Sequence, residues 1–204
     1  MSSLFRTALG GDFDQLALVL RRHYDLALGQ QVVVEGTMET WNRLPWARAL
    51  APFMPIPAER VSVRVLNRGV MDAGELCYEW QREFRYPTCT LTSYTLTRPD
   101  RAGQPARVLD TFNRPANIGL TLALTVRDAG QALIQTTVGP QYLIRGERYL
   151  PLPRFLHIYS LAEERALDED RVYTEVTVSH LLFGRLFGYR GELRVSRGTP
   201  ACAV

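Results

Sequence analysis

The sequence predicts a mainly β domain (α+β), in which a strongly curved antiparallel sheet or open barrel carries an N-terminal helix and a short lid helix. Three observations lead to this fold class. Several segments alternate apolar and polar residues with a period of two. The connections between them are short and contain turn residues, which favours antiparallel neighbours. A sheet of about nine to ten strands tends to curl or close.

The length of 204 residues fits one domain, which we place at residues 1–197, followed by a flexible tail at 198–204. The domain begins with a predicted helix at residues 12–25, in which Asp12 caps the first turn. One apolar stripe runs along this helix at spacings of four, three and four: Leu9, Phe13, Leu16 and Leu20. Gly29 ends the segment.

A strand is predicted at residues 31–40, and a proline-rich segment follows it. A short helix at residues 45–54 fits this segment, because proline is tolerated in a first helical turn. One interpretation makes it a lid over an open end of the sheet. The other makes it a membrane-interfacial helix, but its polar face is poor in arginine, which favours the lid.

Further strands are predicted along the rest of the chain. A hairpin turn at residues 71–74 and a tight turn at 128–130 separate some of them, whereas residues 98–105 and 139–153 read as irregular connections. The predicted strands begin at Arg60, Leu76, Thr88, Arg107, Leu120, Gln131, Phe155, Arg171 and Tyr189. Between the last two lies Ser179–Gly191, a run of large apolar residues with three glycines. We expect this run to be a buried, packed crossover that leads into the final strand.

Composition and charge narrow the function classes. The chain is 46% hydrophobic and 22% charged, and all 24 basic residues are arginines, which are spread along the sequence. A net charge of +3 with this spread does not predict a nucleic-acid binder. The three cysteines lack metal or redox spacing, so we expect idle thiols in a reducing compartment. No stretch predicts a signal peptide or a transmembrane segment, and we expect a cytoplasmic protein.

Several fragments resemble a bacterial family of unknown function, the domain of unknown function 4166 family. The most specific are Leu150–Arg154 (Leu-Pro-Leu-Pro-Arg) and His180–Gly191 (His-Leu-Leu-Phe-Gly-Arg-Leu-Phe-Gly-Tyr-Arg-Gly). Weaker ones are Leu9–Phe13, Val61–Val65, and Glu75 with Trp80, Arg82 and Phe84. Members of the family occur alone, beside saccharopine-dehydrogenase-like domains, and at the C-terminus of YndJ-like membrane proteins. The resemblance implies one domain over almost the whole chain and implies no activity, cofactor or catalytic residue.

Motifs of common enzyme classes are absent from the sequence. It contains no phosphate-binding loop, dinucleotide fingerprint, nucleophile elbow, or metal-ligand spacing of His, Cys or carboxylates. We therefore predict no catalytic residue, no metal and no cofactor.

Individual polar residues still invite a functional interpretation. His180 has the parity of an apolar strand face, so it is either a ligand anchor or a histidine bonded to backbone at a strand end. Glu79 and Glu83 lie opposite the aromatic face and read as the solvated side. Arg82 has the parity of the aromatic face, so it needs a carboxylate partner, for which Asp110 or Glu175 could serve, or it binds an anionic head group.

The function we predict is binding of a hydrophobic or amphipathic, lipid-like small molecule in the concave face of the sheet. The candidate ligand-binding residues share an aromatic or polar side chain near that face: Trp46, Tyr78, Trp80, Arg82, Phe84 and His180. One alternative is an enzyme or accessory domain that uses His180 or Glu79 as a general base. Another is a protein interaction domain that uses residues 41–54 as its contact face. The sequence leaves the oligomeric state open.

Overall fold

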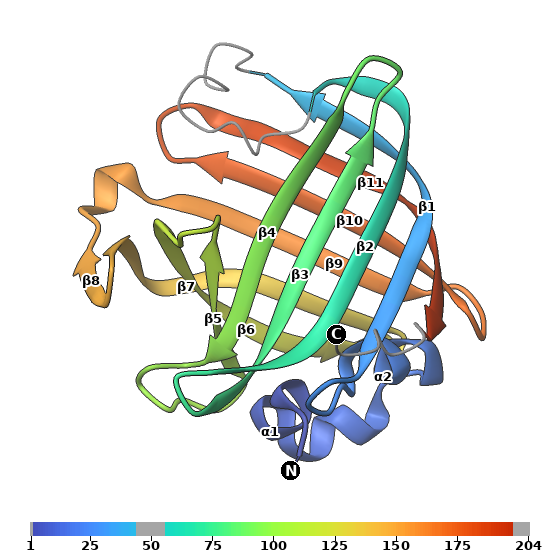
Figure 1. The fold of residues 1–204 in the computed structure, drawn as a ribbon, viewed down its shortest axis with the longest axis horizontal. Coiled ribbons are helices and arrows are strands. Elements are labelled where there is room, and N and C mark those ends of the chain that lie inside the picture. The colour runs from blue at the N-terminus through green and yellow to red at the C-terminus, as the bar shows by residue number, and fades with distance from the viewer. Residues whose placement is uncertain (1, 44–55, 198–204) are drawn as a thin grey trace, which may run out of the picture.

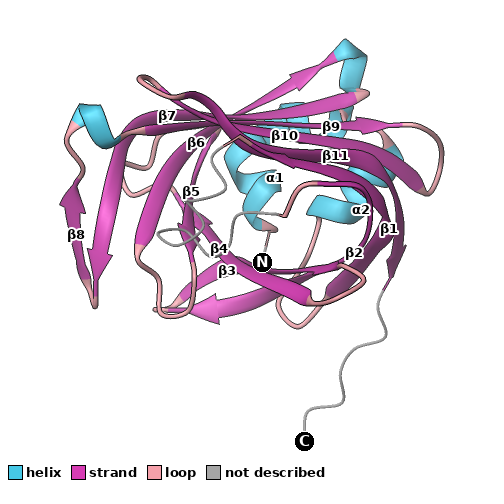
Figure 2. Ribbon diagram, turned by 90° about the horizontal axis from the view of Figure 1, so that it is seen from above, coloured by secondary structure: helices cyan, strands magenta, loops and turns pink. Residues whose placement is uncertain are grey.

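The protein is a closed antiparallel β-barrel. The computed structural model describes residues 2–43 and 56–197. One sheet of eleven strands has the order β6-β5-β4-β3-β2-β1-β11-β10-β9-β7-β8, and pairing of β6 with β7 closes ten of these strands into a barrel. Figure 1 shows the strands crossing one another on the two walls of the barrel, and Figure 2 shows the curved wall from above. The predicted mainly β class with a strongly curved antiparallel sheet is confirmed, and the sheet is closed.

The helices and strands have the following bounds: α1 (Leu4–Leu9), η1 (Gly10–Gln15), α2 (Leu18–Tyr24), β1 (Gln31–Asn42), β2 (Ala58–Asp72), β3 (Glu75–Arg85), β4 (Thr90–Pro99), β5 (Arg107–Phe112), β6 (Ile118–Arg127), η3 (Asp128–Gly130), β7 (Ala132–Arg145), β8 (Arg148–Pro151), η4 (Arg154–Leu156), β9 (Ile158–Ala166), β10 (Arg171–His180) and β11 (Gly184–Arg197). The predicted lid helix at 45–54, with Trp46, lies outside the described residues.

The period-two alternation explains why these segments form a barrel. In β2, Val61, Val63 and Val65 are buried while the residues between them are more exposed. Facing side chains from the other strands join them in one hydrophobic core. Closure leaves no free edge within the ten-stranded ring, so each of these strands has neighbours on both sides.

The N-terminal helices close one end of the barrel (Figures 1 and 2). Phe5, Phe13 and Leu20 are fully buried there, which confirms that the apolar stripe faces the core. The single helix predicted at 12–25 is wrong, because Leu16 and Ala17 adopt extended backbone angles between η1 and α2. The amide of Ala17 donates a 2.9 Å hydrogen bond to the carbonyl oxygen of Gly130. The β6–β7 turn thus accepts a hydrogen bond from an amide at which the helix would otherwise have continued.

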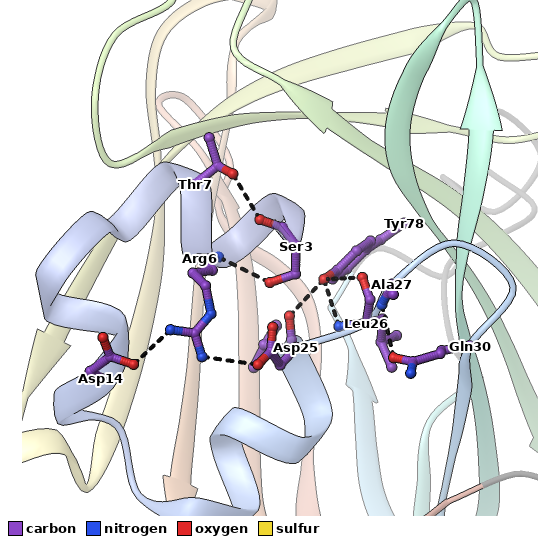
Figure 3. Close-up of polar contacts among 10 residues, drawn as sticks. Ser3, Arg6, Thr7, Asp14, Asp25, Leu26, Ala27, Gln30 and Tyr78 are labelled. Atoms are coloured by element: carbon purple, nitrogen blue, oxygen red, sulfur yellow. Dashed lines mark hydrogen bonds and ion pairs between the residues drawn. The ribbon is translucent and has the colours of Figure 1, made fainter. Parts of the chain in front are cut away.

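Polar contacts fix these helices to the barrel, as Figure 3 shows. The Tyr78 hydroxyl on β3 lies 2.7 Å from the carbonyl oxygen of Tyr24 and accepts a 2.9 Å bond from the amide of Leu26. Burial raises the pKa of Tyr78 to about 12, so the hydroxyl stays protonated and able to donate. Arg6 donates to Asp25 at 3.0 Å; burial would raise the pKa of Asp25, but hydrogen bonds from Arg6 and Ser3 outweigh it and lower that pKa.

Two predictions for the C-terminal half are wrong. Residues 139–153 are not irregular, since β7 continues to Arg145 after a register shift and then pairs with β8. The turn Leu181–Phe183 is not a buried crossover, because it joins two adjacent antiparallel strands and its side chains are 58–71% exposed. Among the described residues nothing covers this hairpin connection at the barrel end, and its large apolar side chains are exposed.

Candidate functional site

The barrel encloses a cavity of about 150 Å³ between the N-terminal helices and the opposite end. Its lining mixes polar and apolar side chains, with the ionisable ones near the middle and the helices. The main polar lining residues are His23, Arg82, Thr95, Asp110, Gln135, Glu164 and Thr174, and the main apolar ones are Phe84, Phe112, Ile118, Ile158, Val178 and Phe187. The cavity is therefore amphipathic along its length.

Among the described residues, the cavity lining is less buried at the end opposite the helices. At the helix end the lining side chains Tyr24, His23 and Trp80 are 0–5% exposed. At the other end the lining residues Phe112 and Ile118 are only half-buried. We call this second end the open end of the barrel. A molecule entering there passes apolar walls before it reaches the polar cluster.

Arg82 is the central cation of the cavity. Its Nη1 donates a 2.8 Å hydrogen bond to the Thr95 hydroxyl, and its guanidinium carbon lies 5.4 Å from the centre of the Trp80 ring. Within the described residues no Asp or Glu forms an ion pair with Arg82. The predicted ion pair with Asp110 or Glu175 is therefore not formed. A guanidinium carries five N–H donors, so Arg82 retains capacity for an acceptor from outside the protein.

Both carboxylates in the cavity are held by other groups. Asp110 accepts a 2.6 Å hydrogen bond from the Thr97 hydroxyl, and burial raises its pKa although Thr97 and Arg82 oppose that shift. Glu164 lies 3.0 Å from Nδ1 of His23. Burial would raise the pKa of Glu164, but His23, a hydrogen bond from Tyr24 and the charge of Arg82 together outweigh burial and lower it. The charge of Arg82 acts on both carboxylates, but neither forms an ion pair with it within the described residues.

Two polar atoms of lining residues, His23 Nε2 and the Thr174 hydroxyl, have no hydrogen-bond partner within the described residues. The Thr174 hydroxyl is buried and makes no hydrogen bond within the described part of the chain. A buried hydroxyl without a partner costs about 1–3 kcal/mol, so such a group is expected to meet water or a ligand. Thr174 therefore offers an unpartnered hydroxyl to an occupant of the cavity, beside Arg82, which is hydrogen-bonded to the Thr95 and Tyr189 hydroxyls and has further N–H donors.

The structure brings three of the predicted ligand-binding residues together. Trp80, Arg82 and Phe84 project from β3 into the cavity, because residues two apart on a strand share a face. Tyr78 lies beyond them and binds the N-terminal helices instead. Trp46 is outside the described residues.

His180 sits at the end of β10 and is not among the residues that line the cavity. Its Nε2 lies 2.9 Å from the carbonyl oxygen of Phe155, and its Nδ1 accepts a 3.1 Å bond from the amide of Leu182. Both ring nitrogens are thus engaged with backbone, as in the second interpretation of this residue. His157 likewise meets a backbone carbonyl, that of Leu152, at 2.9 Å.

Glu79 lies on the outer face of the barrel wall, opposite Trp80, but it is not solvated as predicted. It is 5% exposed, and its carboxylate accepts hydrogen bonds from Arg68 and Arg114. The reason is charge pairing: a carboxylate can be buried where two arginines supply donors. Glu83 pairs with Arg85 and remains partly exposed.

Glu164 and His23 were not anticipated as cavity residues. Glu164 lies on the same inward face of β9 as Ser160 and Ala162, because it is two residues from Ala162. This spacing along the strand could have placed Glu164 in the cavity from the sequence. His23 comes from α2, and no local pattern predicts that this helix brings it to β9. Among the described residues, no group of three or more His, Cys, Asp or Glu side chains is arranged to hold a metal ion. No helix in that part of the chain is long and apolar enough to cross a membrane.

Comparisons with known proteins identify a family but no activity. No curated protein matches the chain. Among solved structures, one described as a "putative thioesterase II" from Thermobifida fusca YX shares 11% identity, with 85% of this chain and 80% of that chain covered. Its TM-score is 0.26, which is too low to carry an argument about fold or function. The family model for the domain of unknown function DUF4166 matches residues 16–193, and the chain belongs to that family.

Proposed function

We propose that the barrel binds a small amphipathic molecule that carries a hydrogen-bond-accepting head, with a carboxylate as the best fit. The observation that carries this proposal is Arg82, a cation in the cavity whose neighbouring carboxylates are engaged by Thr97 and His23. An acceptor oxygen from a ligand satisfies the remaining N–H donors, and a carboxylate matches the planar guanidinium with two parallel bonds.

The apolar part of the ligand follows from the gradient along the cavity. Phe84 and Phe112 line the route from Arg82 to the open end. A volume of about 150 Å³ holds a molecule roughly the size of benzene. The head and the first few carbon atoms fit inside, and a longer tail extends between the apolar side chains toward the open end.

This geometry supports binding better than general-base catalysis. His180 and Glu79, the bases considered from the sequence, are not among the residues that line the cavity. His23 does line it, but its Nε2 is fully buried and its ring lies 5.3 Å from that of Trp80. A base must reach the proton that it removes.

The proposal predicts a preference for carboxylates that depends on Arg82. Native mass spectrometry of protein purified without detergent, and melting curves with octanoate or octanol, measure binding and head-group preference. We expect octanoate to raise the melting temperature more than octanol does. Arg82→Met should weaken octanoate binding at least tenfold, because hydrogen bonds to charged groups contribute about 1.5–3 kcal/mol.

Two further variants separate binding from folding. Arg64→Met removes a cation from the outer face of β2, where it pairs with Glu35, and should leave octanoate binding unchanged. Ser160→Trp fills the cavity with an indole and should abolish binding of both ligands. Absence of any co-purifying or added ligand on the wild type, or equal octanoate affinity in Arg82→Met, would refute the proposal.

A further inference from the structure

An exposed apolar surface lies at the open end of the barrel. It consists of Phe155, Leu156, Leu181, Leu182 and Phe183, whose side chains are 49–71% exposed, and we call it the rim patch. Five large apolar side chains in two short connections are more than scattered surface residues. Clustered exposure of this kind marks a surface that contacts something apolar.

The two halves of the rim patch are held in one place. Phe155 and Leu156 belong to η4, and Leu181–Phe183 form the turn between β10 and β11. His180 joins them, because its Nε2 meets the Phe155 carbonyl at 2.9 Å while its ring lies 5.0 Å from that of Phe183. The patch is therefore a built feature of the fold, and His180 positions it.

The rim patch adjoins the cavity. Ile158 and Val178 line the cavity and lie within a few residues of the patch along β9 and β10. Ile158 also pairs with His180 across the sheet. In Figure 1 the β10–β11 turn lies at the end of the barrel away from α1 and α2. An apolar surface is thus continuous from the outside of the protein to the inside of the barrel.

Charge is distributed unevenly between the two ends. At the helix end, the turns carry Asp100, Asp128, Asp168, Glu169 and Asp170. At the open end, the described connections 86–89, 113–117, 152–157 and 181–183 contain no Asp or Glu, and they contain Arg114 and Arg154. Glu147, in the β7–β8 turn, lies between Arg145 and Arg148.

Two arginines flank the rim patch itself. Arg154 precedes Phe155, and Arg185 follows the turn at the start of β11. Both are exposed, and neither forms an ion pair within the described residues. Exposed apolar side chains beside unpaired cations are the combination that binds anionic lipid surfaces, in which the apolar groups enter the bilayer interface and the cations meet the head groups.

We propose that the rim patch docks the barrel on an anionic lipid bilayer, with its open end facing the membrane. The connections 86–89, 113–117, 152–157 and 181–183 contain no Asp or Glu, which favours this occupant over a basic protein surface, and the flanking arginines complement anionic head groups. This inference goes beyond ligand binding and has its own test, because it concerns the outside of the barrel. Docking in this orientation places the cavity entrance at a source of amphipathic molecules.

Co-sedimentation with vesicles tests the docking. Vesicles of phosphatidylcholine alone and with 30% phosphatidylserine are compared, at low and high salt, using the full chain. We expect stronger binding to the anionic vesicles and weaker binding at high salt. Leu182→Ser with Phe183→Ser should reduce binding roughly tenfold or more. Arg154→Gln and Arg185→Gln should each weaken it about fivefold.

The matched control removes apolar groups at the opposite end. Leu28→Ser with Leu167→Ser changes side chains that are 54% and 43% exposed near the helices, and it should retain full vesicle binding. Arg82→Met should also retain it, which separates docking from the cavity ligand. The proposal fails if the wild type does not sediment with anionic vesicles, or if the control loses as much binding as the rim variant. It also fails if light scattering shows a dimer that the rim variant dissociates without any vesicle binding, because the patch is then a protein interface.

Discussion

At the scale of single residues, the cavity combines a cation and two carboxylates whose environments act in opposite directions. Burial raises the pKa of Asp110, whereas for Glu164 the contacts with His23 and Tyr24 and the charge of Arg82 together outweigh burial and lower the pKa. The difference has a geometric cause. Glu164 has a ring nitrogen at 3.0 Å, while Asp110 has only the neutral Thr97 hydroxyl in hydrogen-bond contact. Ionised Asp110 is therefore a destabilising element of the folded barrel.

The raised pKa of Asp110 leads to a pH-dependent prediction for the stability of Asp110→Asn. The folded pKa of Asp110 lies above its ordinary value of 3.8, so its charge costs stability at neutral pH, and that cost disappears as the pH falls through the folded pKa. The asparagine variant avoids the cost. We expect it to be more stable than the wild type at pH 7, with an advantage that shrinks toward pH 4.

Urea unfolding of both proteins at several pH values measures this advantage. Asp72→Asn, at an exposed β2 position paired with Arg98, is the control and should show no such gain at neutral pH. A constant difference between wild type and Asp110→Asn across the pH range would contradict the assigned shift.

Sequence reasoning reached part of this cluster. Parity along β3 was enough to place Trp80, Arg82 and Phe84 on the inner face, because the pleat fixes which residues share a side. It could not show that α2 carries His23 into the barrel beside Glu164, because that contact spans 141 residues and depends on how the helices fill the end. It also left open whether Arg82 pairs with a carboxylate or binds an anionic head group, because parity cannot supply the distance that decides whether an ion pair forms.

At the scale of elements, strands β1 and β11 depend on glycine where they pack most closely. A Cβ atom at Gly191 would overlap the backbone oxygen of Thr37 and the Met38 side chain, and one at Gly36 would overlap the backbone of β11. Inward-facing glycines allow neighbouring strands of a barrel to coil tightly. Gly188 and Gly191 of the Ser179–Gly191 run thus serve the close packing of β11, whereas Gly184, at φ 64°, serves the turn, and none marks a buried crossover.

Gly191→Ala should therefore destabilise the barrel by about 1–3 kcal/mol, since the backbone atoms that it meets cannot rotate away. Gly11→Ala is the matched control, because no atom lies within 4 Å of a Cβ built there. Denaturant midpoints of the two variants measure the difference. Equal midpoints would mean that the two strands separate at little cost.

The errors in element prediction share one physical origin. The helix at 12–25 failed because a barrel turn supplies an acceptor for Ala17, and the turn at 181–183 was placed inside because apolar residues usually are. In both cases the local sequence identified apolar residues correctly, but it could not show what those residues would contact in the folded barrel. The strands were predicted well because the alternation of apolar and polar residues reflects the two faces of the barrel wall, which the strands themselves form.

At the scale of the whole molecule, helices seal one end of the barrel, and no described α-helix covers the other. Phe5 is fully buried among aromatic rings, 4.4 Å from that of Tyr24 and 5.4 Å from that of Tyr78. The helices share one hydrophobic core with the strands. Helices and barrel should therefore unfold together as a single cooperative unit.

The variant Phe5→Ala tests whether the helices and the barrel unfold as one cooperative unit. Loss of a fully buried phenyl ring typically costs about 3–5 kcal/mol, and here the cost should appear in every part of the fold. Hydrogen exchange should show faster exchange both in α2 and in strands distant from Phe5, such as β10, because global opening controls the slowest amides. Phe155→Ala, at a 62% exposed position of the open end, should leave exchange in both regions unchanged. If Phe5→Ala accelerates exchange in the helices alone, the helices form a separate unit that can open without the barrel, and ligand could then enter from that end as well.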